Sequence, residues 1–336
     1  MKRATIKDIA AIAGVNVSTV SRALRDHPDI GLALRTKIKQ LAHDMHYHPN
    51  MLAVQLRKQK SNTIGLIIPE ANMYFIPSVI KGISHAVQKA GYRLLVLQSG
   101  ESYEQELENV NICNEYGVEG LLISLTNETE HLDHLNDLND AGIPIVLMDK
   151  VLANAIFDEV IIEDIQATQL CVNYLIETGC KRILGLFGNP NMMITNKRLE
   201  GFKQAIETKI PELDIIYEHE FADNTFSAWA CVEQVFPDFQ PDAIFAMSDE
   251  ILAGVIPALK KMKIKIPEQC SVIGISDGYL PKILDPQVSF LYHNGFALGN
   301  LAATHLLKKL ANPLRNDNQE RLLLPTELII HNSTRG

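Results

Sequence analysis

Residues 5–26 read TIKDIAAIAGVNVSTVSRALRD. Thr5 and the acid three residues later match the pattern of a capping box, and the apolar positions that follow share one helical face as far as Gly14. Asn16 can cap a second helix, which we expect from about Val17 to Arg25. Two short helices joined by a tight glycine turn are typical of a helix-turn-helix.

A third helix should close this small module. Leu34, Ile38, Leu41 and Met45 recur at intervals of four, three and four residues, which places them on one helical face. This face can pack against the first two helices and complete a small core. The outward face of the second helix is then free to enter the major groove of DNA.

The charge of the chain is divided unevenly along its length. Residues 1–60 contain 11 Lys and Arg against 4 Asp and no Glu, a charge of +7, so the rest of the chain must carry −16 to give the total of −9. A compact basic module on an acidic body suggests a polyanionic partner held by one end. A merely solvated basic surface is the alternative.

Length and composition limit the class of protein. The 336 residues, 46% of them hydrophobic, suffice for one small and one large domain. The N-terminus lacks the apolar run of a signal peptide, and no stretch reaches the roughly 18 apolar residues of a membrane span. The five cysteines are widely spaced and match no metal motif. We therefore expect a soluble cytoplasmic protein with no membrane segment, metal or cofactor.

After residue 61, short apolar runs alternate with segments of helical length. The runs are IGLIIP, RLLVLQS, EGLLISL and PIVLMD, and the rhythm then restarts with RILGLFG, DAIFAMS and SVIGIS. Continuous apolar strands between helices predict parallel sheets covered on both faces. Two doubly wound lobes fit better than one very large sheet, with a ligand cleft at the carboxyl ends of the strands.

These segments together resemble the lactose/galactose repressor (LacI/GalR) family. The resemblance rests on residues 5–26, on YHPNMLAVQLRKQKSNTIGLIIP, and on RLEGFKQAI, PDAIFAMSDEILAGVIPALKK and SVIGISDG, so it covers nearly the whole chain. It implies a DNA-binding headpiece followed by a two-lobed effector domain with the periplasmic-binding-protein-like fold. The expected boundaries are 1–48 for the headpiece, 49–60 for a hinge, 61–160 with 293–320 for the first lobe, and 161–292 with 321–336 for the second.

The resemblance also implies which residues contact operator DNA. In the family the second helix reads base edges, which carries over to Val17, Ser18 and Arg22. Arg22 can donate two hydrogen bonds to O6 and N7 of one guanine. Further candidates for DNA contacts, mostly to phosphates, are Lys2, Arg3, Thr5, Lys7, Thr19, Ser21, Arg35 and Lys37.

Residues 49–60 resemble the hinge of this family. The segment is too short to form a stable helix alone, because helix nucleation is costly. The resemblance implies that it pairs with the hinge of a second subunit in the minor groove, with Asn50, Ala53 and Leu56 at the DNA and Leu56 wedged into a base step. An ordinary interdomain linker is the alternative.

Eight residues are candidates for binding a small effector. Arg198 matches a position where sugar-binding members place an arginine, and Asp249 follows a strand, where its carboxylate can accept hydroxyl hydrogen bonds. A mutual ion pair between these two, or a solvated strand end, is the alternative. Phe75 and Phe226 match positions of stacking aromatics, although either could pack in a core. The other candidates are Glu163, Asp164, Asp277 and Ser276, which stands where the family usually has an acid.

Enzymatic and transport functions fit the sequence less well. Residues 274–278 read GISDG and match the G-x-S-x-G elbow of serine hydrolases, but prolines interrupt the helix that should follow Ser276. No nucleotide-binding or zinc-protease motif occurs. A solute receptor of a transport system would share the two lobes but would have a signal peptide and no DNA-reading head.

The sequence thus predicts a homodimeric transcription regulator on near-palindromic operator DNA. The effector, with a sugar or sugar derivative expected by resemblance, would shift the lobes and loosen the hinge, which weakens the grip on DNA. Control by a protein co-regulator or a nucleobase corepressor is the alternative. The absence of a leucine heptad tail favours a dimer over a tetramer.

Overall fold

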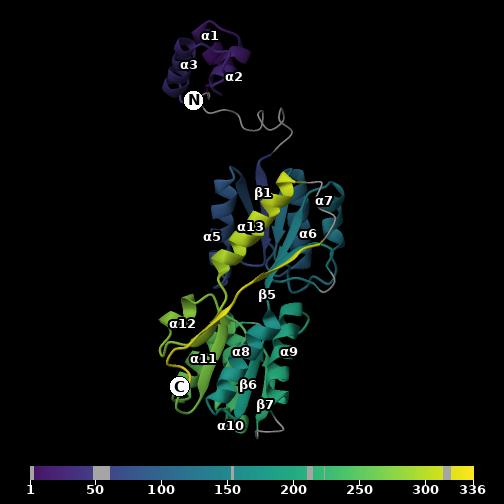
Figure 1. The fold of residues 1–336 in the computed structure, drawn as a ribbon, viewed down its shortest axis with the longest axis vertical. Coiled ribbons are helices and arrows are strands. Elements are labelled where there is room, and N and C mark those ends of the chain that lie inside the picture. The colour runs from purple at the N-terminus through teal and green to yellow at the C-terminus, as the bar shows by residue number, and fades with distance from the viewer. Residues whose placement is uncertain (1–3, 48–60, 153–154, 210–214, 223, 313–318) are drawn as a thin grey trace. The chain divides into compact units, whose positions relative to one another are not determined.

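A computed structural model describes residues 4–47, 61–152, 155–209, 215–222, 224–312 and 319–336. The chain divides into two units, Met1–Ser61 and Asn62–Gly336 (Figure 1). The described helices and strands are α1 Ile6–Ala13, α2 Val17–Ala23, α3 Leu32–Asp44, β1 Thr63–Ile68, α5 Ile76–Lys89, β2 Arg93–Gln98, α6 Tyr103–Glu115, β3 Gly120–Ile123, η1 Asp133–Leu135, α7 Asn136–Asp140, β4 Ile145–Met148, β5 Asp158–Ile162, α8 Asp164–Glu177, β6 Arg182–Phe187, α9 Met193–Glu207, β7 Ile216–Phe221, α10 Thr225–Phe239, β8 Ala243–Ala246, α11 Asp249–Lys261, β9 Ser271–Ser276, α12 Tyr279–Ile283, β10 Ser289–Tyr292, α13 Gly295–Ala311, β11 Arg321–Leu324 and β12 Glu327–Ile329.

The first unit contains the three expected helices. The predicted capping box at the start of α1 is confirmed, because the Thr5 hydroxyl accepts a hydrogen bond from the Asp8 amide while the Asp8 carboxylate accepts one from the Thr5 amide. Gly14 ends α1 in the left-handed conformation, with φ of 69°. The side chains of Ile9, Val20 and Ile38, one from each helix, are fully buried. These contacts form the small core that the spacing of apolar residues predicted.

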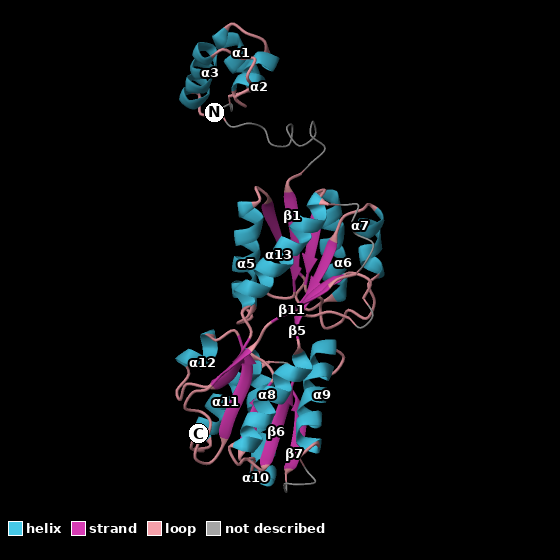
Figure 2. Cartoon of the chain, viewed as in Figure 1, coloured by secondary structure: helices cyan, strands magenta, loops and turns pink. Residues whose placement is uncertain are grey.

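The second unit contains two six-stranded sheets, one in each lobe (Figure 2). The first-lobe sheet has the order β11-β5-β4-β3-β1-β2 and is parallel throughout. The second-lobe sheet has the order β12-β10-β9-β8-β6-β7, in which only β12 runs antiparallel to its neighbour. The prediction of two doubly wound parallel lobes is therefore confirmed.

Helices cover both faces of the first-lobe sheet. Leu66 and Leu122 point into the core shared with α5 and α13, whereas Ile67 and Leu121 point into the core that contains Val110 of α6. Alternate residues of one strand thus enter two different cores, which explains why the strands read as continuous apolar runs. Among the described residues, no helix is long and apolar enough to span a membrane.

Two glycines allow α5 and α13 to pack closely. A Cβ atom on Gly82 would lie 2.1 Å from the carbonyl oxygen of Phe296, and a Cβ on Gly299 would lie 2.2 Å from that of Val79. No side chain can be placed at such distances, so the backbones approach only because both residues are glycine. The contact between α5 and α13 joins the beginning of the first lobe to the segment that returns to this lobe after β10.

The chain passes between the lobes three times. It leaves the first lobe after β5, returns after β10, and leaves again after β11. The last boundary differs from the expected one at residue 321, because Arg321–Leu324 pairs with β5 and thereby belongs to the first lobe. Only the segment that includes β12 joins the second lobe. β11 is a short edge strand after a long helix, and its sequence does not show which sheet it joins.

Candidate functional site

The second helix of the headpiece presents a free face. Val20 and Ala23 turn inward and are buried, while Val17, Ser18 and Arg22 are exposed. Within the described part of the chain, the Arg22 side chain has no hydrogen bond or ion pair. A short helix with an unengaged guanidinium on its outer face has the chemistry needed to read guanine in a major groove.

The other predicted DNA-contact residues divide into three groups. Lys7 and Lys37 are exposed and free of ion pairs within residues 4–47, whereas Thr19 is half-buried and the Ser21 hydroxyl accepts a hydrogen bond from Arg25. The Arg35 guanidinium donates to the carbonyls of His27 and Ile30, which ties it to the loop before α3. Lys2, Arg3, Asn50, Ala53 and Leu56 lie outside the described residues.

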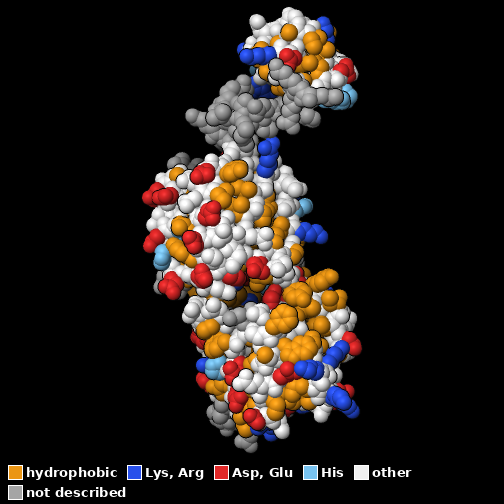
Figure 3. All heavy atoms as spheres, turned by 180° about the vertical axis from the view of Figure 1, so that it is seen from behind, with side chains coloured by type: hydrophobic (Ala, Val, Ile, Leu, Met, Phe, Trp, Pro, Cys, Tyr) orange, Lys and Arg blue, Asp and Glu red, His pale blue; other side chains and the backbone are white. Residues whose placement is uncertain are grey.

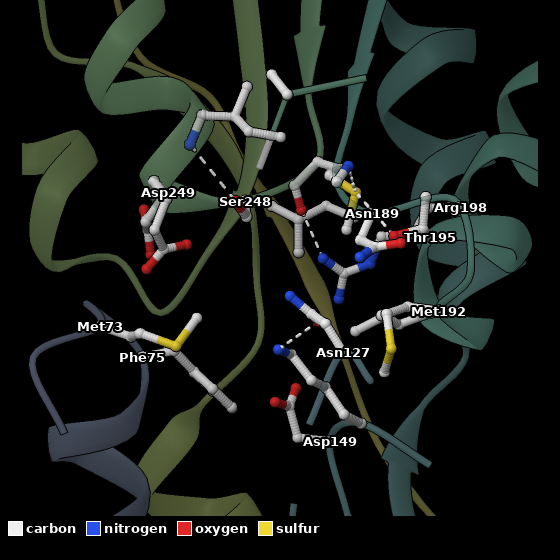
Figure 4. Close-up of a pocket in the computed structure, with 18 of the residues that line it drawn as sticks. Met73, Phe75, Asn127, Asp149, Asn189, Met192, Thr195, Arg198, Ser248 and Asp249 are labelled. Atoms are coloured by element: carbon white, nitrogen blue, oxygen red, sulfur yellow. Dashed lines mark hydrogen bonds between the residues drawn. The ribbon is translucent and has the colours of Figure 1, made fainter. Parts of the chain in front are cut away.

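The second unit has a cavity between its two lobes, at the carboxyl ends of the strands (Figure 4). Its volume is about 130 Å³, which is small beside the roughly 300–1,000 Å³ of pockets for drug-sized ligands. Phe75 and Asp149 line it from the first lobe, and Asn189, Arg198 and Asp249 line it from the second. A ligand in this position would contact both lobes and would therefore depend on their relative orientation.

Arg198 lies in the wall of this cavity and is almost entirely buried. Its Nε donates to Oδ1 of Asp164 at 2.8 Å, and Nη1 donates to the carbonyl oxygen of Met247 at 2.5 Å. The guanidinium has five N–H groups, so others are left to donate to a ligand. The expected alternative of an Arg198–Asp249 ion pair is wrong, because the partner is Asp164.

Asp249 reaches the cavity from the first residue of α11. It is 3% exposed, and within the described chain its Oδ1 has no hydrogen-bond partner. Burial raises the pKa of the Asp249 carboxyl to about 7, against a smaller opposing effect of a hydrogen bond from Ser276. A buried oxygen without a partner is costly, so this atom is prepared to accept a bond from a ligand.

An aromatic pair forms another part of the wall. The rings of Phe75 and His293 stack with centroids 4.4 Å apart and planes inclined by 24°. Burial lowers the pKa of His293 to about 3, so its imidazole is neutral at physiological pH. The two rings give one side of a ligand an uncharged surface.

The structure does not bring every candidate to the cavity. Phe226 is 85% exposed in the first turn of α10, which Asn224 caps, and it does not line the cavity. Asp277 accepts a hydrogen bond from the Tyr279 amide, and Glu163 is exposed. Ser276 is fully buried, and its hydroxyl accepts a hydrogen bond from the Gly278 amide. Asp164 acts through Arg198, which leaves Phe75, Arg198 and Asp249 as the candidates that line the cavity.

Sequence reasoning missed a polar group on the first-lobe side. Lys150 donates to Glu101 at 2.5 Å and to the Asn127 side chain at 2.9 Å. Asp149 lies beside them, and burial raises the pKa of its carboxyl to about 6. Each of these residues follows the carboxyl end of β2, β3 or β4. Asp249 was selected because it follows a strand, and the same criterion applied to the first lobe selects these residues as well.

Comparison with known families gives two matches. The model for "Bacterial regulatory proteins, lacI family" matches residues 5–50, and that for "Periplasmic binding proteins and sugar binding domain of LacI family" matches residues 61–332. Together they cover the headpiece and both lobes.

Individual relatives cover the chain from end to end. The transcriptional repressor PurR of Vibrio atlanticus is 28% identical over 98% of both chains, the ribose operon repressor of Haemophilus influenzae is 27% identical over 98% of both, and the repressor CytR of Escherichia coli is 28% identical over 99% of this chain and 97% of its own. Among solved structures, the Lac repressor dimer bound to operator and the anti-inducer ONPF aligns over 100% of both chains with a TM-score of 0.88 at 21% identity. A LacI-family regulator from Enterococcus faecium with bound ribose aligns over 81% of this chain and 98% of its own, with a TM-score of 0.70 at 23% identity.

Proposed function

Because the chain belongs to the LacI family of bacterial regulatory proteins, we propose that it is a cytoplasmic transcriptional repressor whose affinity for operator DNA is set by a small effector in the interlobe cavity. One observation carries the proposal: among the described residues, a helix-turn-helix whose Arg22 side chain has no hydrogen bond or ion pair is combined with a domain whose cavity contains a buried carboxylate oxygen without a hydrogen-bond partner. The first feature is suited to DNA and the second to a small polar molecule.

Recognition of DNA would use the exposed face of α2. Arg22 donates to a guanine, Val17 and Ser18 contact neighbouring base edges, and Lys7 and Lys37 meet phosphates. In a dimer, two such helices read half-sites about one helical turn or a small multiple apart, so the operator should be nearly palindromic.

A selection from random DNA duplexes tests this part. Purified full-length protein should enrich a near-palindromic sequence, and its affinity should fall steeply with salt, by roughly 0.9 log units per log salt for each phosphate contacted. Enrichment of no sequence, or of a single half-site only, would contradict the proposed role.

Control by the effector would act through the lobes. A ligand that touches Phe75 and Asp149 in one lobe and Arg198 and Asp249 in the other stabilises one relative orientation of the two. The free energy available for switching is the difference in its affinity for the two orientations. Sugars and nucleobases both have hydroxyl or amide groups that these side chains can bind.

A second copy of the chain is the proposed partner. Hydrophobic side chains gather on the face of the second lobe that Figure 3 shows. Among the exposed hydrophobic side chains of this lobe are Phe226 on α10 and Tyr279 and Ile283 on α12, and both helices pack against α11. Similarity to the Lac repressor dimer supports a homodimer that covers this patch.

Sedimentation equilibrium tests the dimer. Phe226→Asp should place a charge in the interface and shift the wild-type dimer toward monomer. Leu170→Asp is the matched control, since Leu170 is also exposed but lies on α8, which packs against α9. A dimer unaffected by Phe226→Asp would exclude this patch as the interface.

A further inference from the structure

The cavity has more acidic than basic groups. Four carboxylates line it, on Glu101, Asp149, Asp249 and Glu250, against two cations, Lys150 and Arg198. Equal numbers of acidic and basic groups would suit a neutral ligand, whereas this excess of acidic groups makes the electrostatic potential inside the cavity negative.

Both cations are already neutralised by partners. Lys150 is paired with Glu101 at 2.5 Å, and Arg198 is paired with Asp164 at 2.8 Å. The carboxylates of Asp149, Asp249 and Glu250 have no cationic partner in the part of the chain that the structure describes. An anionic ligand would therefore be repelled by these three acids, and both cations of the cavity already have an acidic partner.

Asp249 is the acid that most needs a partner. Its Oδ1 is buried and has no hydrogen-bond partner among the residues that the structure describes, whereas Asp149 accepts a hydrogen bond from the Ser124 hydroxyl and Glu250 accepts one from the Tyr74 amide. Figure 4 shows the Asp249 carboxylate at the edge of the cavity, above Met73 and Phe75. Burial raises the pKa of this carboxyl to about 7, and a bound cation would lower it again.

The remainder of the wall suits a hydroxylated ring. Asn127, Asn189, Thr195 and Ser248 place amide and hydroxyl groups around the cavity, and Phe75 offers an aromatic face. Such groups donate to and accept from hydroxyls equally well. The cavity volume of about 130 Å³ limits the ligand to a small molecule.

We infer that the effector is a small hydroxylated amine, such as an amino sugar, and that its ammonium group is held by Asp249. The inference rests on the proposed function and narrows the class of ligand. It excludes sugar phosphates and sugar acids, because their charge would lie against unpaired carboxylates. A neutral sugar would leave Asp249 with an ordinary hydrogen bond where an ammonium group makes a stronger, charge-assisted one.

Matched ligands test the charge directly. Isothermal titration calorimetry of the full chain near neutral pH would compare glucose, glucosamine, N-acetylglucosamine and glucose 6-phosphate, and then the same four derivatives of galactose and mannose. In at least one series the free amine should bind about tenfold or more tightly than its parent sugar and its N-acetyl derivative, and the phosphate should not bind. This comparison uses the unmodified protein and does not depend on whether a variant folds.

Variants then identify the carboxylate. Asp249→Asn should remove the preference of about tenfold for the amine over its parent sugar, because an amide has no negative charge to pair with the ammonium group. Glu163→Gln is the control, because Glu163 is an exposed acid of the same lobe that does not line the cavity.

Three results would overturn the inference: parent sugars or phosphates that bind as tightly as the amines in every series, no binding of any amino sugar, or an amine preference that survives Asp249→Asn. Failure of the proposed function would look different. If a parent sugar binds and Arg198→Lys abolishes its binding, the cavity remains the effector site. If a ligand binds tightly and neither Arg198→Lys nor Asp249→Asn changes its affinity, the ligand binds elsewhere.

Discussion

The headpiece and the interlobe cavity differ in how far apart in sequence their essential residues lie. The headpiece core and its exposed face both come from residues 5–45, within three successive helices. The cavity wall draws on segments from Met73 to His293, which the passages between the lobes after β5 and after β10 bring together. A local pattern is therefore enough to identify the DNA-reading face, whereas the effector site depends on the complete fold.

The largest expected effect lies in the large unit. Arg198→Ala would leave Asp164 buried without its cation, which typically costs about 3–5 kcal/mol. In calorimetry the transition of the second unit should move to a lower temperature while that of the headpiece stays in place. Lys197→Ala, one residue earlier in α9, is the control, since Lys197 forms no ion pair within the described residues. Equal shifts of both transitions would show that the two units do not unfold independently.

Asp249→Asn should stabilise the same unit in a pH-dependent way. The pKa of Asp249 is raised to about 7 in the folded protein from an ordinary 3.8, so folding favours the protonated carboxyl. The free energy of unfolding is therefore highest below the ordinary pKa and falls as the pH rises through 7. Asparagine carries no such charge, and its advantage above pH 7 could reach about 4 kcal/mol at about 1.4 kcal/mol per pKa unit. Urea unfolding of both proteins across this range measures the difference. A gap that does not change with pH would contradict the burial of an ionisable group here.

Arg22→Ala should affect DNA binding alone. Loss of a bidentate guanine contact costs about 1–3 kcal/mol and relaxes sequence preference at one position of each half-site. Fluorescence anisotropy on the selected operator and on single-base variants measures both effects. Lys37→Ala should instead weaken binding to all sequences alike and reduce the salt dependence. If Arg22→Ala changed effector binding as well, the separation between the two regions would be incomplete.

The smallest predicted effect is confined to the headpiece. Thr5→Ala removes the hydroxyl that caps α1 and should destabilise this unit by about 1 kcal/mol. Hydrogen exchange of the headpiece amides would detect the change, with no effect in the lobes. Thr36→Ala is the matched control, because the Thr36 hydroxyl donates to the carbonyl of Leu32 within its own helix and caps no helix end. Similar losses from both substitutions would argue against a specific role of the cap.

Most of the fold could be predicted from the sequence because its central strands are buried on both faces. The runs that became β1, β3, β4, β6, β8 and β9 are continuously apolar and flanked by helices. β7 was not predicted, because the predicted strands were continuous apolar runs. Its sequence IYEHEF instead alternates between apolar and polar residues, as expected of an exposed edge strand. β11 and β12 are also edge strands, and their partners are chosen by the crossovers rather than by their own residues.

The cavity was predicted only in part for the same reason. Asp249 and Arg198 were found from a strand end and from a family position, and both line the cavity. Phe226 was also chosen from a family position, but its side chain is exposed in the first turn of α10 and does not line the cavity. His293 was not among the eight candidates, although it follows β10 directly and stacks on Phe75.

The arrangement of the last two strands makes the C-terminus intolerant of truncation. A stop codon before residue 321 would remove β11 from the edge of one sheet and β12 from the edge of the other, so a single lesion would damage both lobes. Even a later stop would matter, because the buried Ser333 hydroxyl donates to the carbonyl of Val272 and accepts from the Ser289 amide. Affinity tags and reporter fusions should therefore follow Gly336 through a spacer, and shortened clones of the effector domain should keep the full C-terminal segment.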